Sequence, residues 1–116
     1  MHRESGSRSG VADTLDSIAY AHWQLGDNDQ SVRHYEEALA MYRQLGDPQG
    51  EADARIHLGD VQHAAGQEDA ARRNWEQALA LLSQVPGADT QQASGRLRPR
   101  RAADGSSDSP RSSAVQ

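Results

Sequence analysis

The sequence contains no cysteine, no lysine and no phenylalanine. Without cysteine, the chain can form no disulfide, thiolate metal site or thiol nucleophile, and it does not need an oxidising compartment. All twelve basic residues are arginine, which we attribute to biased genome composition and not to function. These absences favour a cytoplasmic protein without thiol chemistry.

Long apolar runs are also missing. No segment approaches the roughly 18 apolar residues of a membrane-spanning helix, and residues 1–10 lack the apolar run of a signal peptide. The sequence has no P-loop, Gly-rich dinucleotide turn, nucleophile elbow or zinc-protease motif. We therefore predict a protein that is not an enzyme, needs no cofactor and does not enter a membrane.

Negative charge is concentrated in the middle of the chain. The net charge is −5, but residues 11–86 carry −8 and residues 87–116 carry +2. Phosphate binding needs clustered positive charge on the folded surface. This distribution therefore argues against nucleic acid as the main ligand.

The sequence does contain an internal repeat, in which "HYEEALAMYRQLGD" returns forty residues later as "NWEQALALLSQVPG". A shift of 40 residues superposes Gly26 on Gly66, and Ala38-Leu39-Ala40 on Ala78-Leu79-Ala80. It also places Tyr35 on Trp75, so residue size is kept where identity is not. Such a period indicates stacked repeats of one structural unit.

Each copy has the periodicity of helices. Apolar residues recur at i, i+3, i+4 and i+7 in two segments per copy. Gly26 and Gly66 stand where a left-handed residue would end the first helix of each pair, and Asp47-Pro48 is typical of a helix start. We predict an all-α fold of four antiparallel helices, at about 11–25, 28–45, 48–65 and 68–85.

The predicted domain organisation is two helix-turn-helix repeats, 10–47 and 48–87, between disordered segments 1–9 and 88–116. After Gly87 the composition shifts to Ser, Gly, Pro, Arg and Asp, which cannot bury enough apolar surface to offset the entropy of ordering. One alternative is that 88–94 folds back as a short cap over the last helix. The segment Arg96 to Arg101 is interpreted as a solubilising tail, with contact to an acidic partner as the alternative.

The spacing of the conserved size classes resembles the tetratricopeptide repeat. The second copy matches the family pattern with Leu58-Gly59, Gly66, Ala71, Trp75 and Ala78, and the first with Ile18-Ala19, Gly26, Ser31, Tyr35 and Ala38. The resemblance implies that these residues pack the helices of the repeats together. It departs from the family at Arg55, which stands where the first copy has Leu15.

The period of about 40 residues is longer than the common 34 of this family. With the linker "YRQLGDPQGEADARIHLGD", it resembles the C-terminal repeat arrays of large actinobacterial transcriptional regulators that carry a nucleotide-binding switch domain. This second resemblance implies an alternative role, as the C-terminal repeat fragment of such a regulator.

The family resemblance also implies a concave face, built by the first helix of each repeat, that binds peptides. Helical spacing places the corresponding residues on one polar stripe. They are Asp13, Asp16, Tyr20, Trp23, Asp53, His57, Asp60 and His63. Four carboxylates with aromatic anchors suit an Arg- or Lys-rich partner segment, whereas the alternative is an acidic face that only meets solvent.

Two other kinds of site are disfavoured on this stripe. His57, Asp60 and His63 lack the His-x-x-x-His spacing that brings two imidazoles to one metal ion. Without lysine, the chain also lacks the cationic clamp with which some members of the family hold chaperone C-termini. We predict a protein or peptide partner and no metal.

Two repeats bury little apolar surface, and about three are normally needed for a stable array. The sequence leaves three solutions open: self-association through the exposed end helices, stacking of upstream repeats in a longer regulator, or folding on a partner.

Overall fold

The computed structural model describes the backbone of residues 2–97 and side chains from residue 10 onward. Within that range the chain is helical and contains no strand. The helices are α1 (His2–Gln24), α2 (Asn28–Leu45), α3 (Pro48–Ala64), α4 (Glu68–Ser83) and α5 (Gln91–Leu97). The predicted all-α fold is confirmed.

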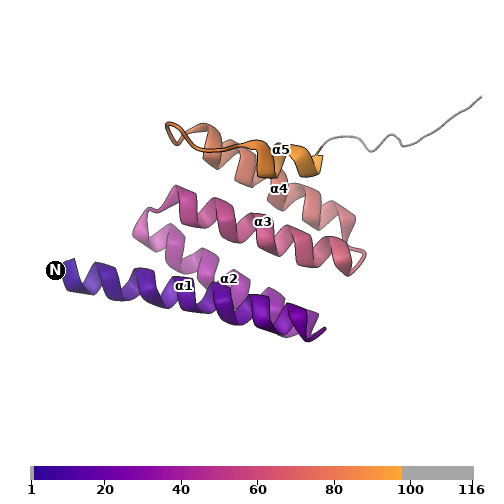
Figure 1. The fold of residues 1–116 in the computed structure, drawn as a ribbon, viewed down its shortest axis with the longest axis horizontal. Helices are drawn as coiled ribbons and strands as arrows, with labels where there is room; N and C mark the ends of the chain where they lie inside the picture. Colours follow the sequence, from indigo (N-terminus) through magenta and orange to yellow (C-terminus); the bar gives the residue numbers. More distant parts are fainter. Residues whose placement is uncertain (1, 98–116) are drawn as a thin grey trace, which may run out of the picture.

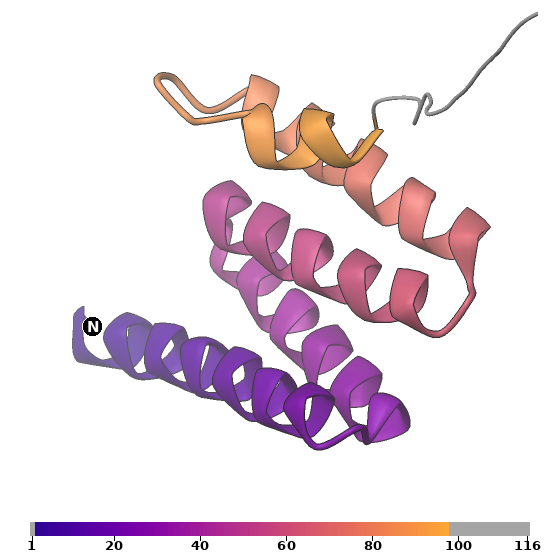
Figure 2. The same cartoon turned by 45° about the vertical axis from the view of Figure 1, so that its right-hand side comes forward.

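The helices form two layers. Helices α1, α3 and α5 lie side by side in one layer, and α2 and α4 lie in the other (Figures 1 and 2). Each helix packs against the next one along the chain, and α1 also touches α3. The arrangement is two stacked helical hairpins, α1–α2 and α3–α4, followed by a short helix on α4. None of the described helices combines the length and apolarity needed to span a lipid bilayer.

Local signals set the helix ends where the sequence predicts them. The Asp27 side chain accepts from Gln30 N at 3.3 Å, and the Asp47 side chain accepts from Gly50 N at 3.0 Å. These carboxylates satisfy backbone donors that have no partner in the first turn of a helix. Gly26 and Gly66 have φ of 83° and 82°, the left-handed conformation that glycine adopts without steric cost.

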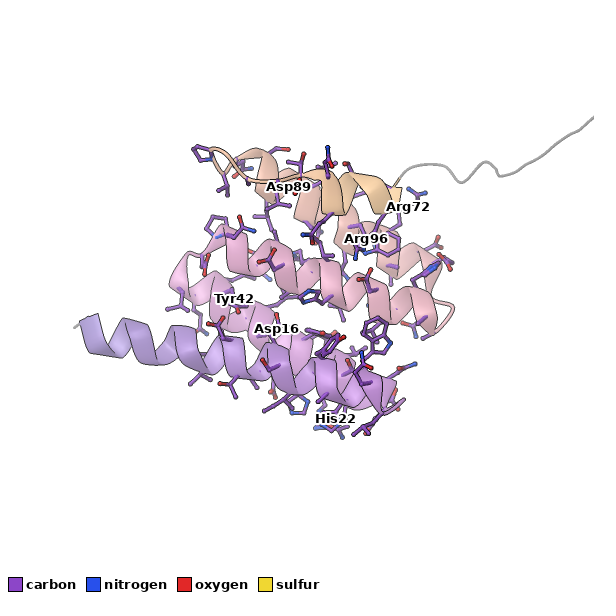
Figure 3. The ribbon with its side chains drawn as sticks, viewed as in Figure 1. Asp16, His22, Tyr42, Arg72, Asp89 and Arg96 are labelled. Atoms are coloured by element: carbon purple, nitrogen blue, oxygen red, sulfur yellow. The ribbon has the colours of Figure 1, made fainter. Side chains whose placement is uncertain are left out.

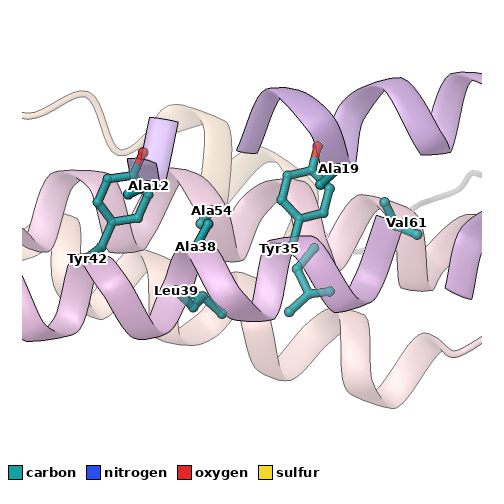
Figure 4. Close-up of a cluster of buried hydrophobic side chains, with 9 residues drawn as sticks. Ala12, Ala19, Tyr35, Ala38, Leu39, Tyr42, Ala54 and Val61 are labelled. Atoms are coloured by element: carbon teal, nitrogen blue, oxygen red, sulfur yellow. The ribbon is translucent and has the colours of Figure 1, made fainter. Parts of the chain in front are cut away.

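The core consists of two clusters of buried side chains. The first joins α1, α2 and α3 around Tyr35, Leu39, Tyr42, Leu58 and Val61, with alanines between them (Figure 4). The second joins α3, α4 and α5 through Ala52, Ile56, Ala78, Leu82 and Ala93. Many of these residues are alanine, so the helices approach closely and the large rings fill the remaining space.

Trp75 shows how that close approach works. Its ring packs onto α3 beside Gly59, and its Nε1 donates to Ile56 O at 3.3 Å. In the first repeat, the buried Ser31 donates to Ala19 O at 2.8 Å, which links α2 to α1. Both contacts satisfy a polar group inside the hairpin, as burial requires.

The structure places the residues predicted to pack the repeats as follows. Ala19, Tyr35, Ala38, Leu58, Gly59, Ala71, Trp75 and Ala78 are buried. Gly26 and Gly66 lie in the interhelical turns and not between packed helices. Ile18 does not pack as predicted, because it lies on the outer side of α1 and its exposed fraction is 38 %.

Arg55 stands where the first repeat has the apolar Leu15, and hydrogen bonds fix its side chain. Its Nε donates to Glu51 Oε2 at 3.2 Å, and its Nη1 donates to Asn74 Oδ1 at 3.0 Å. Asn74 Nδ2 in turn donates to Gln62 Oε1 at 2.7 Å. A polar ladder therefore joins α3 to α4 at the position where the first repeat has Leu15.

Both ends of the fold differ from the predicted boundaries. Helix α1 begins at His2 and not near residue 11, although the first buried side chain described is Ala12. The prediction of disorder from residue 88 is wrong for residues 91–97, which form α5 and bury Ala93 against α4. The small side chain of Ala93 lets the backbone of α5 approach α4, and Ala88 packs against the same cluster. This agrees with the alternative in which 88–94 folds back as a short cap. Residues 98–116, with the arginines at 98, 100 and 101, lie outside the described range.

We predict that Gly59→Ala destabilises the fold. A Cβ at this position would meet the Trp75 indole, with Cδ1 2.7 Å away. Forcing an extra carbon into a packed site costs about 1–3 kcal/mol, whereas glycine to alanine in a helix ordinarily stabilises by about 0.5–1 kcal/mol. Urea unfolding followed by circular dichroism measures the change.

The matched control is Gly10→Ala in α1, where a Cβ would meet nothing within 4 Å. This variant should be as stable as the parent or slightly more stable. Equal stability changes in the two variants would contradict the proposed role of the Gly59–Trp75 contact.

Candidate functional site

The residues predicted to bind a partner lie on the layer formed by α1, α3 and α5. We use the name front face for one group of residues on this layer, of which Figure 3 labels Asp16 and Arg96. The group consists of Asp16, Tyr20 and Trp23 of α1, Asp53, His57 and Asp60 of α3, and Arg96 of α5. Asp13 and His63, also predicted here, make contacts described below that tie them to other helices.

Asp16 and His57 connect the first helices of the two repeats. His57 Nδ1 lies 3.3 Å from Asp16 Oδ1. The Nδ1 atom is buried and has no hydrogen-bond partner other than this carboxylate within reach, so the contact becomes an ion pair when the imidazole is protonated. The interaction with Asp16 raises the pKa of His57 more than burial lowers it, and Asp53 and Asp60 raise it further. The structure thus brings three carboxylates close to one imidazole.

Asp60 holds an arginine from α5. Arg96 Nε donates to Asp60 Oδ1 at 2.6 Å, and Nη2 donates to Oδ2 at 2.8 Å. This two-pronged geometry matches a planar guanidinium to a planar carboxylate. The hydrogen bonds to Asp60 raise the pKa of Arg96. A residue of the predicted tail therefore belongs to the front face.

Two other predicted carboxylates are engaged in the fold. Asp13 accepts a hydrogen bond from Tyr42 OH at 2.5 Å, and burial together with this bond raises the pKa of Tyr42. Asp53 accepts from Gln49 Nε2 at 3.1 Å. Burial raises the pKa of Asp53, against the lowering effects of Gln49 and His57. Asp13 thus anchors α2 to α1, a role that the sequence pattern did not indicate.

The exposed aromatic side chain of the front face is Tyr20 and not Trp23. Tyr20 has an exposed fraction of 50 %. Trp23 is partly buried and packs against the first core cluster. The two rings meet edge to face, with centroids 6.1 Å apart. The partly buried Trp23 therefore packs against Tyr20, and Tyr20 is the aromatic ring of the pair that is more accessible to solvent.

His63 lies at the end of α3 and contacts α4. Its Nδ1 is 2.8 Å from Glu68 Oε2, and its ring centroid is 5.7 Å from that of Trp75. His63 therefore points to α4, away from the contacts that His57 and Asp60 make. In the part of the chain that the structure describes, no three His, Asp or Glu side chains are placed to hold a metal ion.

A separate cleft of about 310 Å³ lies among α2, α3 and α4. Leu39 and Leu58 form part of its wall, beside the polar side chains of Arg55, Gln62 and Asn74. These three polar groups are bonded to one another in the ladder described above, and the charged side chains of Glu36 and Arg43 complete the polar part of the lining.

Stacked helical hairpins in two layers define the class of helical repeat proteins, or α-solenoids. Within this class, the family model described as "Tetratricopeptide repeat" matches residues 10–94, from the first repeat into α5. The chain belongs to the tetratricopeptide repeat family. No curated protein sequence matches it. Repeats of this family generally mediate protein–protein interaction and are typically not enzymes.

We predict a pH dependence of stability that comes from His57. Because its pKa is raised in the folded state, the stabilisation is complete below the unfolded value near 6.5 and is lost as pH rises through the higher folded value. The His57 side chain has an exposed fraction of 42 %, so solvent screening limits the effect to at most about 1 kcal/mol.

Urea unfolding between pH 5.5 and 8.5 tests this prediction. The free energy difference between the parent and His57→Gln should shrink as pH rises. Asp16→Asn should remove most of the same pH dependence, and the double variant should add little to either single variant. Additive effects of the two substitutions would contradict a direct pair.

Proposed function

We propose that this protein is a non-enzymatic interaction module whose front face binds a basic peptide or protein segment. The observation that carries the proposal is the placement of Asp16, Asp53 and Asp60 around His57, next to the half-exposed Tyr20. Carboxylates attract and orient a basic segment, and an exposed aromatic ring supplies contact area at low entropic cost. The partner is a protein or peptide, and nucleic acid is not part of this proposal.

The charge of the whole folded body supports the same partner. Residues 11–86 carry a net charge of −8. A field of one sign raises the rate at which an oppositely charged partner arrives, and salt weakens it. Binding of a basic segment should therefore weaken as ionic strength rises.

A non-enzymatic role agrees with the chemistry of the front face. The paired groups there are carboxylates with His57 and Arg96, and the sequence has no cysteine to act as a thiol nucleophile. The proposal includes a cytoplasmic location, because a cysteine-free fold does not require an oxidising compartment.

A second candidate concerns the outer side of α1. Val11 and Ile18 of α1, and Leu25 directly after its last residue, recur every seven residues and have exposed fractions of 49 %, 38 % and 81 %. Residues at this spacing form one stripe along a helix. A second copy of the chain, or a further repeat stacked on α1, would cover this stripe. The further repeat corresponds to the alternative role as the C-terminal part of an actinobacterial transcriptional regulator.

We predict that Tyr20→Ala weakens binding of a basic peptide about tenfold or more, because an aromatic anchor contributes disproportionately to an interface. The probe is an acetylated and amidated pentapeptide with two arginines separated by alanine, titrated into the ¹⁵N-labelled chain at low ionic strength. The control is Leu25→Ala, which removes an exposed apolar side chain outside the front face. Equal effects of the two substitutions, or no peptide binding at all, would contradict the proposed function.

Self-association through α1 is tested by sedimentation equilibrium of the full chain. If the stripe pairs two copies, the apparent mass rises with concentration and Ile18→Glu abolishes the rise, because a charge in a buried apolar contact is costly. The control is Gln44→Glu on α2, an exposed position where the substitution adds the same single negative charge. A parent chain that stays monomeric at the highest concentration measured would rule out pairing of copies.

A further inference from the structure

The pair between Arg96 and Asp60 joins residues 36 positions apart in the sequence. The carboxylate accepts two nearly parallel N–H groups, and the remaining Nη1 donates to Gln92 O at 2.7 Å within α5. The exposed fractions of the two side chains are 33 % for Arg96 and 20 % for Asp60. The contact is well formed and still open to water.

Helix α5 has few means of holding its position. It is seven residues long, and its buried residue is Ala93. A helix of this length is not stable alone, so it depends on its contacts with α4 and α3. At the N-terminus of α5, the Gln91 backbone N–H donates to Asp89 Oδ1 at 2.9 Å. Detaching α5 would uncover Ala93 and the apolar residues of α3 and α4 that pack against it, whereas release of the Arg96 side chain alone would leave this packing intact.

If the Arg96 guanidinium moved away, the Asp60 carboxylate would lose its ion-pair partner. Asp60 lies close enough to raise the pKa of His57 together with Asp16 and Asp53, so the carboxylates share one region. A guanidinium from another molecule could make the same two parallel hydrogen bonds that Arg96 makes. A lysine ammonium could not, because it is a point charge without the planar fork.

We propose that Asp60 is the arginine-binding position of the front face, that Arg96 occupies it in the unbound chain, and that an arginine-bearing partner binds by displacing Arg96. This inference rests on the proposed function of the front face. It adds that the residue by which the partner is anchored is an arginine. It also adds that Arg96 of the chain itself competes with this arginine for Asp60. Only molecules in which Arg96 has left Asp60 can bind the partner in this way. The apparent affinity therefore falls in proportion to the fraction of such molecules.

A purely structural pair would have the opposite consequence. If Arg96 only fastened α5 to the fold, removing its charge would leave partner binding unchanged or weaken it. If Arg96 competes for Asp60, removing its charge strengthens partner binding. The sign of the effect therefore distinguishes the two roles.

The test titrates the ¹⁵N-labelled full chain with the two-arginine pentapeptide and with its lysine counterpart. Arg96→Gln should bind the arginine peptide about threefold to tenfold more tightly than the parent, because an exposed pair is a weak competitor. Asp60→Asn should weaken the arginine peptide, and Arg96→Gln should have no further effect in that background. The lysine peptide should bind less tightly and respond less to either change.

The charge control is Arg33→Gln on α2, an exposed arginine in the other layer. It lowers the positive charge by the same amount, so a tightening equal to that of Arg96→Gln would overturn the inference in favour of a general electrostatic effect. An Asp60→Asn variant that binds as well as the parent would also overturn it.

The Arg96 Nε–Hε signal gives a second measurement that does not depend on how any variant folds. In the parent chain it should move from a bonded to a solvent-exposed position as the arginine peptide is added. A signal that stays in place while the peptide binds through Tyr20 would overturn the inference and leave the proposed function standing. If neither the parent nor Arg96→Gln binds the peptide, the inference and the proposed function both fail.

Discussion

Close approach of helices at glycine and alanine positions is the constraint on which this structure depends. Gly59 has no side chain, and this allows the Trp75 ring to lie against α3 and to donate to Ile56 O. Tyr35 has the equivalent place in the first repeat, where Ala19 and Ala38 are fully buried. Because each large ring needs a small residue opposite, the repeat sequence conserves size more strictly than identity.

Many buried residues are alanine, so polar contacts also help to position the helices relative to one another. Ser31, Tyr42 and Arg55 each link neighbouring helices through a hydrogen bond. One acceptor in these links, Asp13, is a carboxylate that helical spacing had assigned to partner binding. The fold therefore uses a side chain of the predicted binding stripe, and the proposed partner would meet the carboxylates that the fold leaves.

Most of the fold follows from local signals in the sequence, and most of the site does not. Helix α2 spans Asn28–Leu45, as predicted, because a capping aspartate and a glycine fix its ends within a few residues. The pair of Asp13 with Tyr42 depends instead on the stagger of two helices, which periodicity does not encode. For helix α5, composition favoured disorder because it measures the amount of apolar surface, and only the alternative of a short cap at 88–94 anticipated a helix that buries Ala93 here.

The two ends of the array are unlike each other. On one end, α1 presents an uncovered apolar stripe, whereas on the other, α5 covers apolar residues of α4. Head-to-tail stacking of copies would need complementary surfaces at both ends, and in the described chain α5 occupies one of them. The proposed association through α1 would then take the form of a two-fold symmetric pair, which closes on itself. In that case a seven-residue helix would set the size of the assembly.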